Sequence, residues 1–226
     1  ELLASTDPAD STLSDHARLR ASNWSGTVVP TFRPDEVTRI DGAGWSHAIT
    51  RLAAAADRSI GGYADYIQAL VERRAAFVAA GARASDHGTA TADTTPLSDA
   101  DARRIFDRAL AGDLQPGDAD AFEAHMLYTS AEMAADAGLV LQLHPGVQRS
   151  YDHGQAARFG TDIGYDIPVA MEYTRALRPL LNNVGHHPGF RMIVFTIDET
   201  VFSRELAPLA GVYPSLRLGA PWWFLD

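Results

Sequence analysis

Short apolar runs alternate along this chain with longer segments of helical period, and this alternation restricts the possible fold more than any other feature. It is typical of parallel strands joined by helices, which is the arrangement of α/β proteins. We therefore predict an α/β fold with a parallel sheet of six strands. The predicted strands are Leu2–Ser5, Thr27–Phe32, Ala82–Ser85, Leu139–Leu143, Arg191–Thr196 and Leu216–Gly219.

The segments between these strands have the apolar spacing of amphipathic helices. Residues 88–97 are rich in Thr, Asp and Gly and are predicted to form an exposed loop, and a long polar loop is expected between Gly146 and Val169. The predicted helices are Asp15–Leu19, Trp45–Asp57, Tyr63–Ala80, the stretch from the cap Ser98 to Ala111, Asp118–Ala137, Val169–Leu181 and Phe202–Leu209.

A polar cluster lies at the carboxyl end of every predicted strand, the edge where parallel α/β proteins bind their ligands. Each cluster alone has an ordinary explanation, because Asp-Pro and Pro-Asp pairs are common in turns and helix caps. Six clusters in succession favour a binding site at this edge. The clusters are Thr6-Asp7, Arg33-Pro34-Asp35, Ser85-Asp86-His87, His144-Pro145-Gly146, Thr196-Ile197-Asp198 and Trp222-Trp223.

The formal net charge of −10 argues against a nucleic-acid partner, because binding to phosphates depends on clustered Lys and Arg. A small anionic substrate is still compatible, since one or two arginines set the local field. The chain has no cysteine, so any metal must be held by residues such as His, Asp or Glu. No apolar run approaches the roughly 20 residues that cross a bilayer, so we expect a cytoplasmic protein without a membrane role.

The opening residues Glu1–Asp7 have neither an initiator Met nor a basic region. They match neither a signal peptide nor a natural start. We therefore expect that the chain has been cut into at this end.

Five segments carry a family resemblance: Ser5–Pro8, Pro30–Asp35, Ala84–His87, Gln142–Arg149 and Gly219–Asp226. They look like consecutive motifs of the uronate (glucuronate) isomerases, which belong to the amidohydrolase superfamily. Their order and spacing agree with the family over essentially the whole chain. The His-x-Gly-x-x-Arg segment and the closing tryptophan pair are the most specific parts of the resemblance.

The resemblance implies a (β/α)8 TIM barrel, of which residues 1–226 would form one incomplete domain with strands two to seven and their helices. The family's first strand carries a His-x-His metal motif, and its eighth ends in an Asp followed two residues later by an Arg. Nothing in this chain matches either motif. The adjacent His186-His187 have no residue between them and are predicted to lie in a solvated turn.

The activity that the resemblance implies is aldose–ketose isomerisation of a hexuronic acid in sugar-acid catabolism. Glucuronate would become fructuronate, or galacturonate would become tagaturonate, and the choice between them stays open. The reaction moves a proton from C2 to C1, which requires an anion grip, an electrophile and an acid/base pair. The resemblance also implies a small uronate substrate and a divalent metal, with zinc as first choice, and we expect a homo-oligomer.

His144 is the predicted metal ligand, because imidazole suits a zinc-like ion and the superfamily often has a ligand at the end of its fifth barrel strand. Asp86 and His87 are the catalytic candidates: His87 would bind substrate or orient another group while Asp86 fixes its tautomer, and a cap is the ordinary alternative for His87. Arg33 and Arg149 are predicted to grip the uronate carboxylate through their planar guanidinium groups, with a surface ion pair as the alternative.

Trp222 and Trp223 are predicted to stack on the sugar or exclude solvent, with plain packing as the alternative. Two loops depart from the family pattern: Thr196–Asp198 stands where many relatives have Asn-Pro, and Arg149–Asp152 replaces an Arg followed by asparagines. Substrate contacts from these two loops are therefore in doubt. Gly160–Asp166 keeps the family's Asp-x-Gly-x-Asp pattern and is a candidate lid or scaffold.

Two other functions stay open. A metal-dependent hydrolase of the same superfamily would use its metal to activate water, often in a binuclear centre. A catalytically incomplete fragment would bind sugar acids, or assemble with partners, without turnover. The sequences of the first and eighth barrel strands would distinguish these alternatives, because those strands carry most of the family's metal ligands and its acid/base residue.

Overall fold

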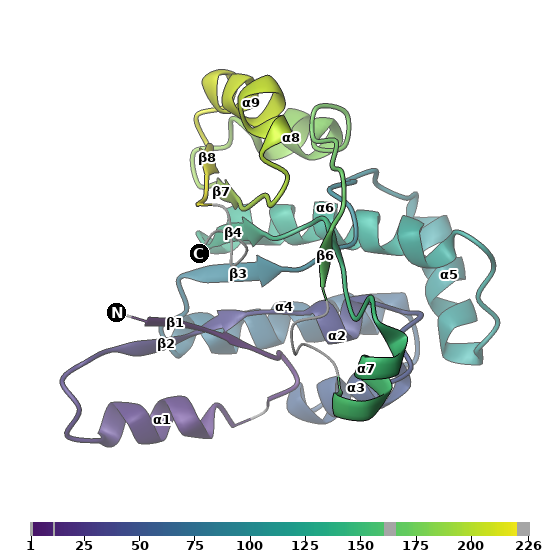
Figure 1. Ribbon diagram of the computed structural model, residues 1–226. Helices are drawn as coiled ribbons and strands as arrows, with labels where there is room; N and C mark the ends of the chain where they lie inside the picture. Colours follow the sequence, from purple (N-terminus) through teal and green to yellow (C-terminus); the bar gives the residue numbers. More distant parts are fainter. Residues whose placement is uncertain (1, 11, 161–165, 221–226) are drawn as a thin grey trace.

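The computed structural model describes residues 2–10, 12–160 and 166–220. Its central sheet has six strands in the order β1-β2-β3-β4-β7-β8, and every neighbouring pair is parallel (Figure 1). The strands are β1 Leu2–Thr6, β2 Val28–Phe32, β3 Ala84–His87, β4 Val140–Leu143, β7 Arg191–Val194 and β8 Leu216–Leu218. All six predicted strands are thereby confirmed.

The strands follow one another across the sheet in the order in which they occur in the sequence. A doubly wound sheet would instead reverse its strand order at a switch point, so this sheet is singly wound, as in a (β/α) barrel. The described sheet is therefore a partial barrel of the predicted α/β class.

Helices connect the strands and cover the sheet (Figure 1). They are α1 Ser14–Ala21, α2 Asp35–Thr38, α3 Trp45–Ala55, α4 Tyr63–Ala79, α5 Asp99–Ala111, α6 Asp118–Ala137, α7 His153–Phe159, α8 Arg178–Val184, the π-helix η1 Phe202–Leu206 and α9 Ala207–Val212. As predicted, the side chain of Ser98 caps α5 by accepting the N–H of Asp101 at 3.1 Å. None of the helices described is long and apolar enough to cross a membrane.

Aromatic side chains from four helices form much of the core. Tyr66 of α4 stacks on Phe106 of α5 with ring centroids 4.9 Å apart, and Trp45 of α3 and Phe122 of α6 pack around Phe106. Burying one such side chain stabilises the fold by about 1.5–3 kcal/mol. The same packing fixes α6, the helix that carries Glu123 of the candidate site.

The predicted helix Val169–Leu181 is wrong over its first nine residues, because the chain is not helical until α8 begins at Arg178. The N–H groups of Tyr173 and Thr174 donate to Glu205 Oε2 at 2.7 and 3.1 Å. A carboxylate that is distant in the sequence thus takes donors that a helix would have used for its own carbonyl groups.

The long polar loop expected after Gly146 also contains regular structure. Strands β5 Val147–Gln148 and β6 Ile167–Pro168 pair antiparallel, and α7 lies between them in the sequence. Two-residue strands are too short to show alternation in a sequence, so this small ribbon could not be predicted.

Candidate active site

The carboxylate of Asp86 is the centre of a polar cluster at the carboxyl edge of the sheet. Ser5 Oγ of β1 donates to Asp86 Oδ2 at 2.6 Å, and Arg33 Nη1, just beyond β2, donates to the same oxygen at 3.0 Å. His144 Nδ1, just beyond β4, lies 2.7 Å from Asp86 Oδ1. Because only 5% of the Asp86 side chain is exposed, three strand ends meet at a nearly dry carboxylate.

Burial alone would raise the pKa of Asp86, but His144, Arg33 and Ser5 together lower it well below its ordinary value. The group is therefore ionised at neutral pH. A carboxylate in this state accepts hydrogen bonds and fixes the position of its partners. The three predicted residues Arg33, Asp86 and His144 are brought together as the sequence indicated.

His87 follows Asp86 directly but faces the opposite side of the sheet. Its Nε2 lies 3.1 Å from Ser85 Oγ, and Ser85 is the register partner of Phe32, whose ring packs against Phe77 of α4. Burial, reinforced by the nearby cation Arg74, lowers the pKa of His87 to about 3, so the imidazole is neutral. Asp86 and His87 were predicted to follow the strand, but β3 extends through His87, and alternation separates them.

Both predicted carboxylate-binding arginines are paired with acids of the chain itself. Arg33 Nε donates to Asp35 Oδ2 at 2.9 Å in addition to its bond with Asp86, and Arg149 Nη1 donates to Asp166 Oδ2 at 3.0 Å. Their role in gripping a substrate stays a prediction. Trp222 and Trp223 lie outside the described residues.

The imidazole of His144 is held on two sides. Its ring stacks on Phe195 with centroids 4.4 Å apart and planes at 10°, while Asp86 holds Nδ1. Phe195 in turn lies so close to Gly219 that a Cβ there would come within 2.4 Å of its ring. A carboxylate on one ring nitrogen is the usual support of a metal-ligating histidine.

The described residues do not complete a metal site. A catalytic zinc generally takes three protein ligands, and no group of three or more His, Asp or Glu side chains is suitably placed within the described ranges. His144 therefore fits the position of a single ligand. The predicted zinc stays a prediction.

A cavity of about 190 Å³ lies beside this cluster. His144 and Arg149 line it, and the loop after β3 supplies Gly88, Thr89 and Ala90. Two carboxylates hold that loop: Asp35 accepts the N–H of Gly88 at 3.2 Å, and Glu123 of α6 accepts the N–H of Ala90 at 3.0 Å.

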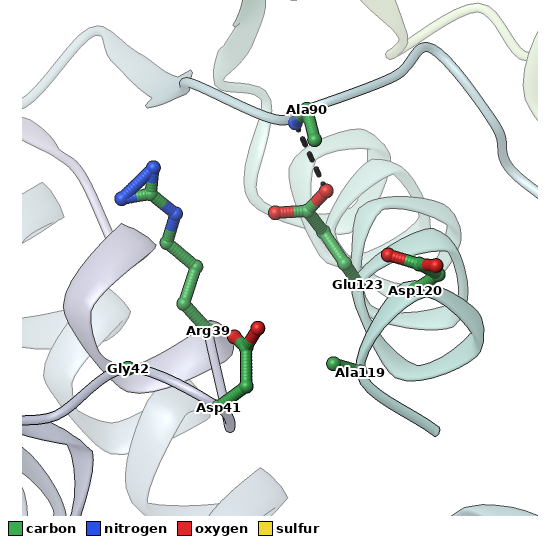
Figure 2. Close-up of a pocket in the computed structure, with 7 residues that line it drawn as sticks. All are labelled: Arg39, Asp41, Gly42, Ala90, Ala119, Asp120 and Glu123. Carbon is green, nitrogen blue, oxygen red and sulfur yellow. Dashed lines mark hydrogen bonds between the residues drawn. The ribbon is translucent and has the colours of Figure 1, made fainter. Parts of the chain in front are cut away.

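An adjoining cavity of about 310 Å³ shares Arg39 and Ala90 with the first, and Figure 2 shows Arg39 and Glu123 extending into it from different elements. Neither residue was predicted from the sequence. Arg39 follows α2 directly, one helical turn beyond the cluster that contains Arg33, and this spacing was the only signal for it. Glu123 had no signal, because it lies within an ordinary helix.

The motifs at the strand ends agree with a known family. A family model described as glucuronate isomerase matches residues 1–226, which is the whole chain. The chain belongs to the glucuronate isomerase family. The uronate isomerase of Corynebacterium efficiens is 50% identical over 227 residues, covering all of this chain and 48% of the relative. The uronate isomerase of Nostoc punctiforme is 46% identical over 226 residues, again covering 100% of this chain and 48% of the relative.

Solved structures of the glucuronate isomerase family have the same fold. The crystal structure of glucuronate isomerase from Caulobacter crescentus is 43% identical with a TM-score of 0.94, over 99% of this chain and 46% of that one. Uronate isomerase from Thermotoga maritima is 25% identical with a TM-score of 0.93, over 100% of this chain and 49% of that one. The chain thus spans about half the length of the relatives it matches.

Proposed function

We propose that the polypeptide containing this chain is a uronate isomerase that interconverts aldose and ketose forms of a hexuronic acid. Glucuronate and fructuronate form one candidate pair, and galacturonate and tagaturonate form the other. The observation that carries the proposal is the Asp86 cluster: a buried, ionised carboxylate holds Arg33 and His144 beside a cavity that Arg149 also lines. The names of the relatives support the same reaction.

The isomerisation moves a proton from C2 to C1 while negative charge develops on the substrate oxygens. The cationic groups of Arg33 and Arg149, fixed by carboxylates of the chain, are suited to stabilise such charge without reorganising during the reaction. The Asp86 carboxylate, 2.7 Å from Nδ1 of His144, and the ring of Phe195 together set the orientation of the imidazole. Of the two catalytic candidates, Asp86 is the one connected to the cavity, through His144.

We assign a divalent metal, preferably zinc, as the cofactor, with His144 as one ligand, and the amidohydrolase superfamily as the wider relationship. We also propose a cytoplasmic homo-oligomer. The support for the metal is the carboxylate-held imidazole, which is the arrangement that metal-ligating histidines generally have.

The test is an assay of the longest natural polypeptide that contains these residues. Incubated with glucuronate or galacturonate and Zn²⁺ or Mn²⁺, it should produce the corresponding ketose. In D₂O the product should carry deuterium from solvent wherever the base exchanges the C2 proton before returning it. A folded, metal-supplied protein that converts neither uronate would refute the proposal.

A further inference from the structure

Arg39 lies between the two cavities of the candidate site. Its backbone is fixed, because its N–H donates to Asp35 O at 3.1 Å and its carbonyl oxygen accepts the N–H of Gly42 at 3.0 Å. Its side chain lines the cavity that His144 also lines. It lines the adjoining cavity with Glu123 as well, as Figure 2 shows. A guanidinium at this position can reach a ligand bound on the His144 side.

Arg39 differs from the other two arginines of the site in that no described carboxylate forms an ion pair with it; Glu123 feels its charge only across the adjoining cavity. Arg33 is bound by Asp35 and Asp86, and Arg149 is bound by Asp166. In the part of the chain that the structure describes, the Arg39 side chain makes no hydrogen bond or ion pair, and the residue is exposed. Its N–H donors are therefore available to an anionic ligand, although Glu123 shares its electrostatic field.

The charges around the adjoining cavity indicate the side on which an anion would bind. Asp41, Asp120 and Glu123 line that cavity and would repel a carboxylate there. The cavity on the other side of Arg39 is lined by Arg149 and His144, and none of its described lining residues is acidic. An anion held by Arg39 is thus favoured on the His144 side.

We propose that Arg39 forms the anion subsite that holds the carboxylate of the sugar-acid substrate at the outer end of the cavity lined by His144 and Arg149. A guanidinium matches the two oxygens of a carboxylate, and such a charged, two-point pairing is stronger than a hydrogen bond between neutral groups. The inference rests on the proposed function, because it takes the substrate to be a uronate. It assigns acid recognition to a residue outside the cluster at the strand ends.

The experiment compares Arg39→Gln and Arg39→Lys in the longest natural polypeptide that contains these residues. The control is Arg104→Gln, which removes an exposed arginine of α5 that lines neither of the two cavities. The probes are two unreactive competitive inhibitors, L-gulonate and glucitol, which differ only in a carboxylate against a hydroxymethyl group.

Arg39→Gln should raise the KM for uronate and the inhibition constant of L-gulonate by roughly tenfold or more, with little change in kcat. Arg39→Lys should lie between the natural protein and Arg39→Gln, because it keeps the charge but loses the planar fork. Inhibition by glucitol, and every parameter of Arg104→Gln, should stay unchanged. Because the Arg39 side chain makes no hydrogen bond or ion pair among the described residues, the melting temperature should change little.

Three outcomes would overturn the subsite: an unchanged KM in Arg39→Gln, an equal loss of both inhibitors, or no binding of L-gulonate by the natural protein. An active isomerase with an unaffected Arg39→Gln variant would refute the subsite and leave the proposed function standing. A protein that binds L-gulonate through Arg39 but isomerises no uronate would do the reverse.

Discussion

Asp86 and His87 are neighbours in the sequence but belong to different regions of the molecule. Asp86 faces the side of the sheet where Ser5, Arg33 and His144 converge, whereas His87 faces α4 and pairs with Ser85. Successive side chains of a strand point to opposite faces, so adjacency in a motif does not imply adjacency in a site.

The two environments make one side chain charged and leave the other neutral. Asp86 is buried but receives a hydroxyl, a guanidinium and an imidazole, so it is ionised. His87 is buried beside a cation without a compensating partner of that kind, so it is neutral. Burial disfavours the charged form of both side chains. The hydrogen-bonding and charged partners therefore decide which of the two is ionised.

The largest expected effect comes from Asp86→Asn. This change leaves the cation of Arg33 without one of its two acidic partners and removes the carboxylate that holds His144. We expect a loss of about 2–4 kcal/mol in the free energy of unfolding, less than for a fully buried pair because Arg33 is a third exposed. Uronate isomerisation should fall by at least a hundredfold. Urea unfolding and steady-state assays measure both effects, and an unchanged stability would contradict the ion-pair assignment.

The second effect is a difference in pH dependence. The pKa of His87 is lowered on folding to about 3, so its contribution is fully present above the unfolded pKa of about 6.5 and is lost as pH falls towards 3. One such group gives a slope of up to about 1.4 kcal/mol per pH unit. The pKa of Asp86 is also lowered, but its contribution is lost only below about pH 4.

Between pH 6.5 and 4.5, His87→Gln should therefore flatten the fall in stability, while Asp86→Asn should leave it intact. His125→Gln is the comparison variant, because burial also lowers the pKa of His125 and a smaller part of the slope belongs to it. Denaturant titrations at several pH values measure these slopes. An unaltered slope in His87→Gln would show that this imidazole is not buried and neutral.

The smallest effects come from a matched pair of serines. Ser5→Ala removes a hydrogen bond to Asp86, and Ser85→Ala removes one to His87. Each should cost about 1 kcal/mol of stability. Only Ser5→Ala should also lower kcat/KM, by roughly threefold to tenfold, because only this serine contacts the cluster beside the cavity. Equal kinetic losses in the two variants would break the distinction between the two faces.

The strand pattern predicted the order and direction of the sheet and the convergence of Arg33, Asp86 and His144. It failed at β3 because of the turn before it. Ala82 N–H donates to Phe77 O at 2.9 Å, so the end of α4 holds this residue and the strand starts two residues later than predicted. Such a shift is decided by a helix end, and apolar patterning in the strand does not record it.

The other failures also have long-range causes. Residues before Arg178 have helical spacing, yet Glu205 binds their backbone donors across 31 and 32 residues of sequence. For Arg39 the sequence offers only its spacing from Arg33, because what distinguishes it among the described residues is that its side chain forms no ion pair while it lines two cavities. Partner choice of this kind depends on the tertiary structure and is not encoded in local spacing.

Gly219 limits which substitutions the far edge of the sheet can accept. A methyl group there would meet the ring of Phe195, and Phe195 lies flat against the imidazole of His144. Because Gly219 has no side chain, Phe195 can occupy its position, and Phe195 in turn supports the ring of His144. A substitution at Gly219 would therefore lower activity in a functional screen as an active-site substitution does, although glycine has no side chain that could take part in the reaction.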